Sequence, residues 1–432
     1  MTKRVLVVGG GVVGITAAYF NALKGNKVTL IEASNEIGGL LKSSSSTFGH
    51  FDYGVHIASR TGQPELDDFL FSQNSQSLHS FTLQEAGSFF NGQLTSFSPF
   101  LNLNSLNGQH KKNAGYELIK APTNIEADNL ATALKIRYGE TAYKEAFEPY
   151  IKHTFGVKPS ELPIYYMQFF DMYRVVAFDE KTSSAVKGIE YLNDRIAFQK
   201  PTPGVEKYYP KTGGIAYWVK GLYKQILSLG VDVILNTTVK SIEYNDKNIS
   251  VKFDDNEHCF NEIDWTISSA ILPHYLPLNN NIKKPNFRKT VLLDFVFQEP
   301  ILTQCKYINN FSPTHLSTRL TCYQNLLPDS TFYAITVEVL VETVKNSEDL
   351  LNKISTELTE MGLVSQSNTC IFSQHRSINE GFPIITREID SSIKKLNAEL
   401  LSKYPNIKLL GRSSSKGFFM SELLIDTYMN CK

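Results

Sequence analysis

The feature that most constrains the fold is a short apolar run followed at once by closely spaced glycines. Residues 4–8, RVLVV, form a continuous apolar stretch rich in valine, which is typical of a strand buried in a parallel sheet. Gly9, Gly11 and Gly14 follow it in a G-x-G-x-x-G pattern. We therefore predict a strand that runs directly into a glycine turn.

A helix and a second strand complete this unit. Apolar residues recur at helical spacing over residues 15–23, and a Gly-Asn pair at 25–26 supplies a stop that commonly ends a helix. Residues 27–32, KVTLIE, then form an apolar run that closes at Glu32. Strand, glycine turn, helix and strand in this order predict an α/β fold that begins with a Rossmann-like βαβ unit.

In such a unit, the three glycines, the helix N-terminus and the terminal acidic residue each have a role in binding a dinucleotide. The first glycine permits a tight turn, the second lets a pyrophosphate approach the backbone, and the third lets helix and strand pack closely. The helix N-terminus offers N–H groups and a positive dipole end to the phosphates. Glu32, eighteen positions beyond Gly14, is placed to accept hydrogen bonds from a ribose diol. This segment alone leaves NAD and FAD as alternatives.

A glycine pair in residues 31–43, IEASNEIGGLLKS, favours FAD. Gly38 and Gly39 resemble the second glycine signature of the two-dinucleotide-binding-domain flavoproteins, in which this segment continues under the flavin. Backbone without side chains is what a loop needs to approach a diphosphate or a ring closely. The resemblance implies that Gly38 and Gly39 contact FAD.

A second stretch, GHFDYGVHI at residues 49–57, extends this resemblance. Asp52, Gly54 and His56 match the D-x-G-x-H pattern found near the isoalloxazine ring in that superfamily. A histidine on its own is more often a core residue with satisfied hydrogen bonds. Within this pattern, the resemblance implies that Gly54 and His56 face the flavin.

Composition excludes several classes of function. Lysine plus arginine and aspartate plus glutamate both number 43, so the net charge gives no sign of a nucleic-acid partner. The five cysteines have no C-x-x-C pair and no histidine at metal-ligand spacing, so we predict no metal site and a reducing compartment. Because no stretch is long and apolar enough to span a bilayer, we expect a cytoplasmic protein without a membrane span.

The length of 432 residues predicts two domains, or one domain with a large insertion. The pattern is helical and aromatic from about residue 93, whereas runs such as TVLLDFVF and TFYAITVEVLV alternate and predict antiparallel strands. We predict an FAD-binding domain in three segments, with a helical insertion and an antiparallel-sheet substrate region between them. The predicted ranges are 1–92, 205–280 and 404–432 for the FAD-binding segments, 93–204 for the helical insertion, and 281–403 for the sheet.

The order of these segments resembles the FAD superfamily of UDP-galactopyranose mutases, protoporphyrinogen oxidases, phytoene-type desaturases and flavin amine oxidases. The stretches DYGVHI, YIKHTFGVKPSELP and YLNDR look most like the mutases, whereas GFPIITREI and NIKLLGRSSSKGFF are shared with protoporphyrinogen-oxidase-like proteins. The resemblance implies a uridine-flanking role for Phe155, and further cofactor contacts at Val239, Gly411 and Arg412.

Three positions depart from the mutase pattern. Phe382-Pro383 stands where the mutases have Tyr-Pro, and the acidic residue expected near Phe419 and Met420, after the Gly-Arg segment, is missing. Residues 176–190 look like additional sequence. These departures leave both the substrate and the type of reaction open.

The first hypothesis is a mutase that isomerises a nucleotide-activated sugar through reduced-flavin N5 chemistry, with NAD(P)H or another donor as reductant. It implies a role in polysaccharide biosynthesis, a nucleotide-sugar substrate and a homodimer. Such a reaction needs arginines for the diphosphate, because guanidinium groups bind phosphate oxygens in a bidentate way. The candidates are Arg174, Arg195, Arg319, Arg376 and Arg387. We predict Arg174 and Arg195, with His56, as catalytic residues, and Phe155, Arg174, Arg195 and Arg376 as substrate-binding residues.

Two alternatives share the same predicted flavin residues. One is an oxidoreductase of the protoporphyrinogen oxidase or amine oxidase type, which takes a hydride from a C–H bond and passes the electrons to oxygen or another acceptor. The other is a catalytically inactive flavin-binding protein that uses aromatic segments such as SFFNGQLTSFSPF to bind a partner.

Overall fold

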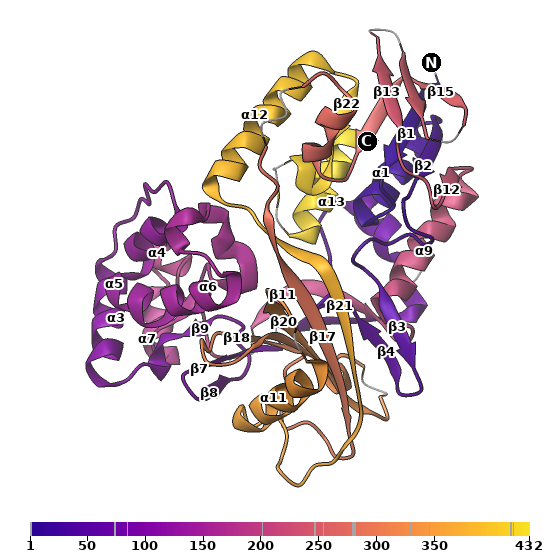
Figure 1. Ribbon diagram of the computed structural model, residues 1–432. Helices are drawn as coiled ribbons and strands as arrows, with labels where there is room; N and C mark the ends of the chain where they lie inside the picture. The colour runs from indigo at the N-terminus through magenta and orange to yellow at the C-terminus, as the bar shows by residue number, and fades with distance from the viewer. Residues whose placement is uncertain are drawn as a thin grey trace.

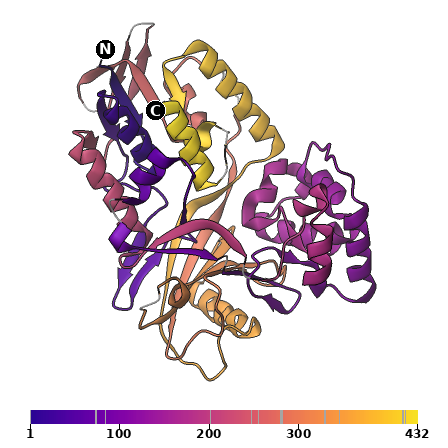
Figure 2. The ribbon, with the colours of Figure 1, turned by 180° about the vertical axis from the view of Figure 1, so that it is seen from behind.

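The computed structural model describes residues 2–72, 75–83, 85–200, 202–245, 248–253, 255–278, 282–327, 330–344, 346–414, 417 and 419–432. Three bodies are visible in Figure 1. They are a parallel sheet with its helices, a group of helices, and a large sheet whose longest strands, β17 (Asn286–Phe297) and β21 (Cys370–Ile384), run between the other two. The view from behind in Figure 2 shows the same arrangement.

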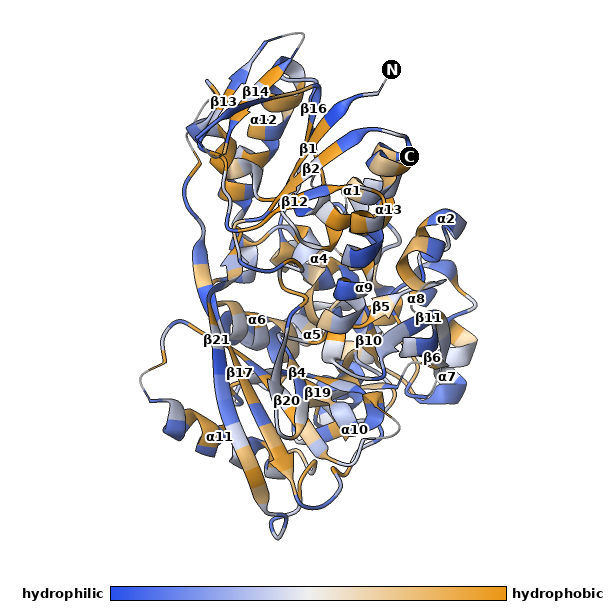
Figure 3. Cartoon of the chain, turned by 90° about the vertical axis from the view of Figure 1, so that its right-hand side faces the viewer, coloured by the Kyte–Doolittle hydropathy of each residue, from blue (hydrophilic) through white to orange (hydrophobic). Residues whose placement is uncertain are grey.

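The parallel sheet has five strands in the order β12-β2-β1-β16-β22, and every pairing in it is parallel. Strands β1, β2, β16 and β22 consist mainly of buried residues, as strands covered on both faces require, whereas the edge strand β12 has no fully buried residue. Figure 3 shows β1 and β2 largely in the colour of hydrophobic residues. The strands are β1 (Arg4–Val8), β2 (Lys27–Ile31), β12 (Asp232–Ile234), β16 (Glu262–Trp265) and β22 (Ile407–Leu409).

This sheet confirms the predicted Rossmann-like unit and its α/β class. The strand predicted at residues 4–8 is β1, and the predicted helix is α1 (Val12–Leu23), which packs against both α9 (Gly214–Ser228) and α13 (Met420–Cys431). The sheet takes its strands from the beginning, the middle and the end of the chain, which is the arrangement expected of a discontinuous FAD-binding domain. A long helix, α12 (Arg387–Lys403), leads into the last strand.

The large sheet has seven strands in the order β21-β17-β20-β19-β18-β7-β8. Its long strands are antiparallel, as predicted, but β18 and β7 pair in parallel, so the sheet is mixed. It also recruits β7 from the range that we expected to belong only to the flavin domain. The remaining strands are β7 (Ala86–Phe90), β8 (Gln93–Thr95), β18 (Tyr307–Asn310), β19 (Ser317–Cys322) and β20 (Tyr333–Val341). Helix α11 (Ser347–Glu360) lies against this sheet.

The helical group surrounds its own apolar core and lies on the far side of β17 and β21 from the parallel sheet in both ribbon views. Its main elements are α3 (Gly108–Lys120), α4 (Leu130–Tyr138), α5 (Glu140–Ala142), η4 (Tyr143–Phe147), α6 (Glu148–Phe155), η6 (Ile164–Asp171), α7 (Glu180–Val186) and α8 (Glu190–Asn193). The range predicted as helical also contains the short paired strands β9 (Leu101–Asn102) and β10 (Val175–Val176).

Smaller sheets connect these bodies. The four serines at 43–46 form β3 (Ser43–Ser46), which pairs with β4 (Gly49–Asp52) in a hairpin. Strand β11 (Pro203–Pro210) pairs with β5 (Ala58–Ser59) and β6 (Leu78–Leu83). An antiparallel meander of β13 (Ser241–Tyr244), β14 (Ile249–Lys252) and β15 (Glu257–Phe260) precedes β16. The predicted boundary at 280/281 lies outside the described residues.

Candidate functional site

The glycine turn after β1 has the geometry that the sequence motif requires. Gly9 has φ of +105°, and an added Cβ at Gly14 would lie 1.9 Å from the Gly9 carbonyl oxygen, so the third glycine allows α1 to approach the turn. Gly11 caps the N-terminus of α1, and an added Cβ there would meet no atom within 4 Å. The turn therefore presents an open backbone face at the N-terminus of α1, which is the shape that a pyrophosphate fits.

The glycine pair at 38–39 lies against this same turn. The N–H of Gly38 donates to the carbonyl of Gly10 at 2.8 Å, and Gly38 forms a parallel bridge with Gly11. Gly38 and Gly39 have φ of +117° and +60°, a region that L side chains rarely adopt. The two glycine segments therefore lie backbone to backbone, and the contact of Gly38 and Gly39 with FAD stays a prediction.

Glu32 lies at the end of β2 with its carboxylate beside the turn. Its Oε2 accepts from the N–H of Gly10 at 2.6 Å, and its Oε1 accepts from the N–H of Ser34 at 2.8 Å and from the Ser34 hydroxyl. The carbonyl of Glu32 accepts from the N–H of Thr237 at 2.9 Å, which places the segment leading to Val239 alongside it. Val239 itself packs in the apolar cluster beneath this end of the sheet. These residues fit a dinucleotide: the open turn would take the diphosphate and Glu32 the ribose.

Gly411 and Arg412 follow β22 at the same end of the sheet. Gly411 has φ of +64° and approaches α1 so closely that an added Cβ would lie 3.1 Å from Val13 Cγ1. Arg412 is exposed. Glu422 accepts from the N–H of Phe419 at 3.0 Å and caps α13.

The segment 52–56 is held by buried polar groups. The Asp52 carboxylate accepts from the hydroxyls of Ser43 and Tyr209, each at 2.6 Å, and from the N–H of Ile215 at 3.0 Å. Burial raises the pKa of Asp52 to about 6, although these hydrogen bonds lower it in part. Gly54 has φ of +132°, so a side chain at this position would be strained.

His56 presents a buried imidazole nitrogen with no partner among the described residues. That atom is Nε2, and an added Cβ at Gly54 would lie 3.3 Å from it. Burial, and then the charge of Arg319, lower the pKa of His56 to about 4, so its ring is neutral at physiological pH. A neutral ring with a free nitrogen fits the predicted position facing a flavin, because it can donate or accept one hydrogen bond.

Two arginine–carboxylate pairs lie against this segment. Arg376 is bidentate to the fully buried Asp294, with distances of 2.8 and 2.7 Å, and also donates to the carbonyl of Asp52 at 3.0 Å. Arg319 is bidentate to Glu338 at 2.9 and 3.0 Å, and Glu338 also accepts from the N–H of Val55 at 2.8 Å. Each of these guanidinium groups is therefore neutralised by a carboxylate.

Arg376, predicted as a substrate-binding arginine, lies beside segment 52–56 as half of a buried ion pair, and its substrate role stays a prediction. Its guanidinium also lies over the Tyr53 ring, 4.5 Å from the ring centroid. The acidic partners were missed, although their sequence context contains a signal. Asp294 in TVLLDFVF and Glu338 in TVEVLV each interrupt an otherwise apolar strand, and a carboxylate buried in this way requires a cation or several donors.

Arg195, predicted as a catalytic and substrate-binding residue, is enclosed by the helical group, and its predicted role stays a prediction. Its side chain is 1% exposed, and its guanidinium donates to the carbonyls of Arg137, Pro122 and Thr123 inside the helical group. The physical reason is that the loop at 122–123 has carbonyls without strand or helix partners, which Arg195 satisfies. Arg195 therefore has a structural role.

Phe155 is also buried, at 1% exposure, at the end of α6. Its ring contacts Phe382, with centroids 5.5 Å apart, and Tyr166, at 5.4 Å. Aromatic residues from β21 and η6 therefore cover the Phe155 ring, and the uridine-flanking position stays a prediction. The Phe382 that replaces the mutase tyrosine is one of those covering residues.

Of the five predicted diphosphate arginines, Arg174 differs from the others. It is half-buried next to β10, its Nε is buried, and it makes no hydrogen bond or ion pair within the described ranges. Arg387, by contrast, is exposed and pairs with Asp128 at 2.6 Å. Arg174 is thus the candidate whose guanidinium remains available to an anionic group.

Two kinds of feature are absent from the described part of the chain. No group of three or more histidine, cysteine, aspartate or glutamate residues there could hold a metal ion. No helix among the described residues is long and apolar enough to cross a membrane.

Comparison with known proteins supports a flavoprotein fold. Residues 7–71 match the family model of the NAD(P)-binding Rossmann-like domain. A coproporphyrinogen III oxidase of Staphylococcus aureus is 24% identical over 275 residues, which cover 59% of this chain and 58% of that protein. A 4,4'-diaponeurosporene oxygenase of the same species is 35% identical over 81 residues, which cover 19% of this chain and 16% of that protein.

Solved structures match the whole fold at low identity. The crystal structure of a reduced UDP-galactopyranose mutase has a TM-score of 0.77 and 17% identity, and the match covers 100% of this chain and 94% of that one. A protein assigned as a protoporphyrinogen oxidase from Exiguobacterium has a TM-score of 0.71 and 16% identity, over 100% and 98% of the chains. A putrescine oxidase bound to putrescine has a TM-score of 0.63 and 12% identity, over 100% and 98%.

Proposed function

We propose that this chain, which has the fold of the FAD-dependent oxidoreductase and flavin amine oxidase superfamily, removes a hydride from a C–H bond of a small-molecule substrate. FAD, when bound, supplies the capacity to accept the hydride. The glycine surface at 9–14 and 38–39 would hold its diphosphate, and Glu32 its ribose. The neutral His56 would face the ring.

The observation that carries this proposal is the charge balance around residues 52–56. A nucleotide diphosphate needs guanidinium groups whose donors and charge are available. Arg376 and Arg319, the predicted arginines nearest this segment, are already neutralised by Asp294 and Glu338. Hydride removal from a C–H bond requires no diphosphate clamp beside the ring. Surroundings of the neutral His56 in which Arg376 and Arg319 are each paired with a carboxylate suit that reaction better than the expulsion of a diphosphate.

The chain's own residues would contribute positioning and protonation control. The network of Asp52 and Asp294 fixes segment 52–56, so the His56 ring would have a defined orientation toward the cofactor. Because burial keeps His56 neutral, its Nε2 can form one hydrogen bond without adding a charge at the reacting carbon. The sequence relative that acts as a coproporphyrinogen oxidase supports the same class of reaction.

A mutase acting on a nucleotide sugar is the second candidate, and Arg174 favours it. Its guanidinium has no partner among the described residues, as a group waiting for a diphosphate would. The fold similarity to UDP-galactopyranose mutase across the whole chain also supports this candidate. The homodimer, the nucleotide-sugar substrate and reduction by NAD(P)H belong to this proposal.

One anaerobic experiment separates the two candidates. In one arm, the oxidised holoprotein is mixed with amines, porphyrinogens or carotenoid precursors. Flavin absorbance is followed, and the masses of the products are measured by mass spectrometry. In the other arm, the chemically reduced holoprotein is mixed with UDP-sugars. We expect loss of flavin absorbance and a dehydrogenated product in the first arm, and no product in the second.

An isobaric sugar product formed only in the reduced arm would overturn the oxidoreductase proposal. The variant Arg174→Met provides a control, because it should abolish that isobaric product if the mutase candidate is right. Replacement of Lys181, an exposed residue of the neighbouring helix α7, by methionine removes a similar charge away from the site. A protein that gives no product in either arm with any of these substrates would favour the inactive flavin-binding alternative.

A further inference from the structure

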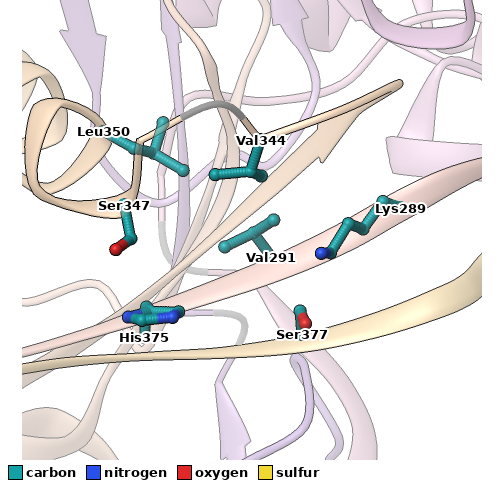
Figure 4. A pocket seen from close by; sticks show the side chains of 7 residues that line it. All are labelled: Lys289, Val291, Val344, Ser347, Leu350, His375 and Ser377. Carbon is teal, nitrogen blue, oxygen red and sulfur yellow. The ribbon is translucent and has the colours of Figure 1, made fainter.

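We propose that the face of the seven-stranded sheet opposite the Arg376–Asp294 pair binds a small aliphatic carboxylate. A pocket of about 250 Å³ lies there, between α11 and the strands β17 and β21. Figure 4 shows the side chains that line it. This site is separate from the predicted flavin surface, and the inference does not depend on the proposed reaction.

Strand alternation explains why the two sites lie back to back. Successive side chains of a strand point to opposite faces of its sheet. On β21, Arg376 points to the face that holds Asp294, whereas its neighbours His375 and Ser377 line the pocket. Ser377 is the cross-strand partner of Val291 on β17, and Val291 lines the pocket too. The pocket is therefore built by the same strands that position the flavin segment.

The base of the pocket is apolar. Val291 and Leu350 are 1% and 7% exposed, and Val344 lines the pocket beside them. In Figure 4, Val291 lies between Ser347 and Lys289, with Val344 and Leu350 above it in the view. An apolar base of this kind favours a ligand with a short hydrocarbon part, because burial of that part removes apolar surface from water. A bare inorganic anion would gain nothing from it.

The rim of the pocket is basic. Lys289 and His375 line it together with the hydroxyls of Ser347 and Ser377, and none of the described lining residues is acidic. Neither Lys289 nor His375 has an ion pair with the residues that the structure describes. In Figure 4 the Lys289 nitrogen is turned toward Val291 and Ser377. An unpaired ammonium group with hydroxyl donors beside it is a recognition site for a carboxylate.

The volume sets the size of the ligand. Pockets that hold drug-sized molecules have volumes of about 300–1,000 Å³, so this pocket suits a smaller molecule. A carboxylate with a short branched or linear chain would place its oxygens at the Lys289 end and its methyl groups over Val291 and Leu350. Neutral isosteres lack the charge that Lys289 would pair with.

The test uses the purified holoprotein and 4,4,4-trifluorobutyrate, which is observed by fluorine NMR. We expect saturable binding, and binding about tenfold weaker in Lys289→Met, because a hydrogen bond to a charged group is lost. The variant Val291→Phe should also weaken binding, because it fills the base of the pocket. The neutral probe 4,4,4-trifluorobutanol and inorganic phosphate should each bind more weakly than the carboxylate.

The matched control is Lys353→Met, which removes an exposed lysine from α11 outside the pocket. It should leave carboxylate binding unchanged, and the flavin absorbance of every variant should match that of the native protein. Equal affinity in Lys289→Met and the native protein would overturn the proposal. So would the absence of saturable binding up to tens of millimolar, or phosphate binding as tightly as the carboxylate. If Val291→Phe folds poorly, Ser377→Val serves as the second pocket variant.

Discussion

Gly11 and Gly14 should respond differently to the same added methyl group, because their surroundings differ. Gly11 has an extended backbone, with φ of −70° and ψ of 174°, that any residue adopts, and an added Cβ meets no atom within 4 Å. Gly11→Ala should therefore change the unfolding free energy of the apoprotein by no more than about 0.5 kcal/mol. Its methyl group, however, enters the open face where the pyrophosphate would lie.

In Gly14→Ala the methyl group would lie 1.9 Å from the Gly9 carbonyl oxygen and 3.1 Å from the Gly9 carbonyl carbon. Both atoms belong to the backbone, so the strain can be relieved only if α1 moves away from β1. Overpacking of this kind costs about 1–3 kcal/mol, and we expect that loss of stability in the apoprotein. FAD affinity should fall as well, because the turn is displaced.

Thermal unfolding of the apoproteins and titration with FAD, followed by flavin fluorescence, measure the two effects separately. If crowding of the pyrophosphate costs a similar 1–3 kcal/mol, FAD binding to Gly11→Ala weakens about ten- to hundredfold. The expected pattern is native stability with weak FAD binding for Gly11→Ala, and a loss of both for Gly14→Ala. Native FAD affinity in Gly11→Ala would refute the assignment of this surface to the cofactor.

Three further predictions concern charged groups. Glu32→Gln should weaken FAD binding about tenfold, because a hydrogen bond to a charged acceptor is stronger than one to a neutral acceptor. As a control, Glu36→Gln, which changes an exposed residue, should bind FAD normally in the same titration. Arg376→Met should lower the unfolding free energy by about 3–5 kcal/mol, since it leaves Asp294 charged and buried. The double variant Arg376→Met/Asp294→Leu should regain much of that stability, as measured by denaturant unfolding. Burial raises the pKa of Asp264 to about 6, from a value near 3.9 in the unfolded chain. The native state is therefore favoured while this carboxyl is protonated. The free energy of unfolding should fall by about 3 kcal/mol as the pH rises from about 4 to 6. Asp264→Asn should therefore gain stability relative to the native protein over that interval, and a difference in unfolding midpoint that does not change with pH would contradict the burial argument.

The sequence predicted the Rossmann-like part of the fold well because that part depends on local rules. A buried strand, a turn that needs glycine, and an amphipathic helix each have a short-range signal, and all of them lie within the first forty residues. The glycine pair at 38–39 was recognised for the same reason: positive φ angles favour glycine. Local features of this kind can be predicted from a short stretch of sequence.

The helical group and the seven-stranded sheet were predicted less well because they depend on contacts between distant segments. Whether Arg195 faces a pocket or the carbonyls at 122–123 depends on how a loop more than seventy residues away packs, and residue type does not reveal this. The ion pair of Arg376 with Asp294 likewise joins two neighbouring strands whose register is set by the long sheet. The parallel pairing of β7 with β18 also connects segments far apart in the chain.

The central claim is that the glycine surface holds FAD rather than NAD(P), and the most direct test is to identify the cofactor. The native protein and Gly11→Ala would be saturated with FAD and separately with NAD(P), desalted, denatured, and the released molecules quantified by mass spectrometry. We expect FAD near one molecule per native chain, markedly less in Gly11→Ala, and little NAD(P) in either. Retention of NAD(P) in place of FAD, or equal FAD retention in the two proteins, would contradict the account.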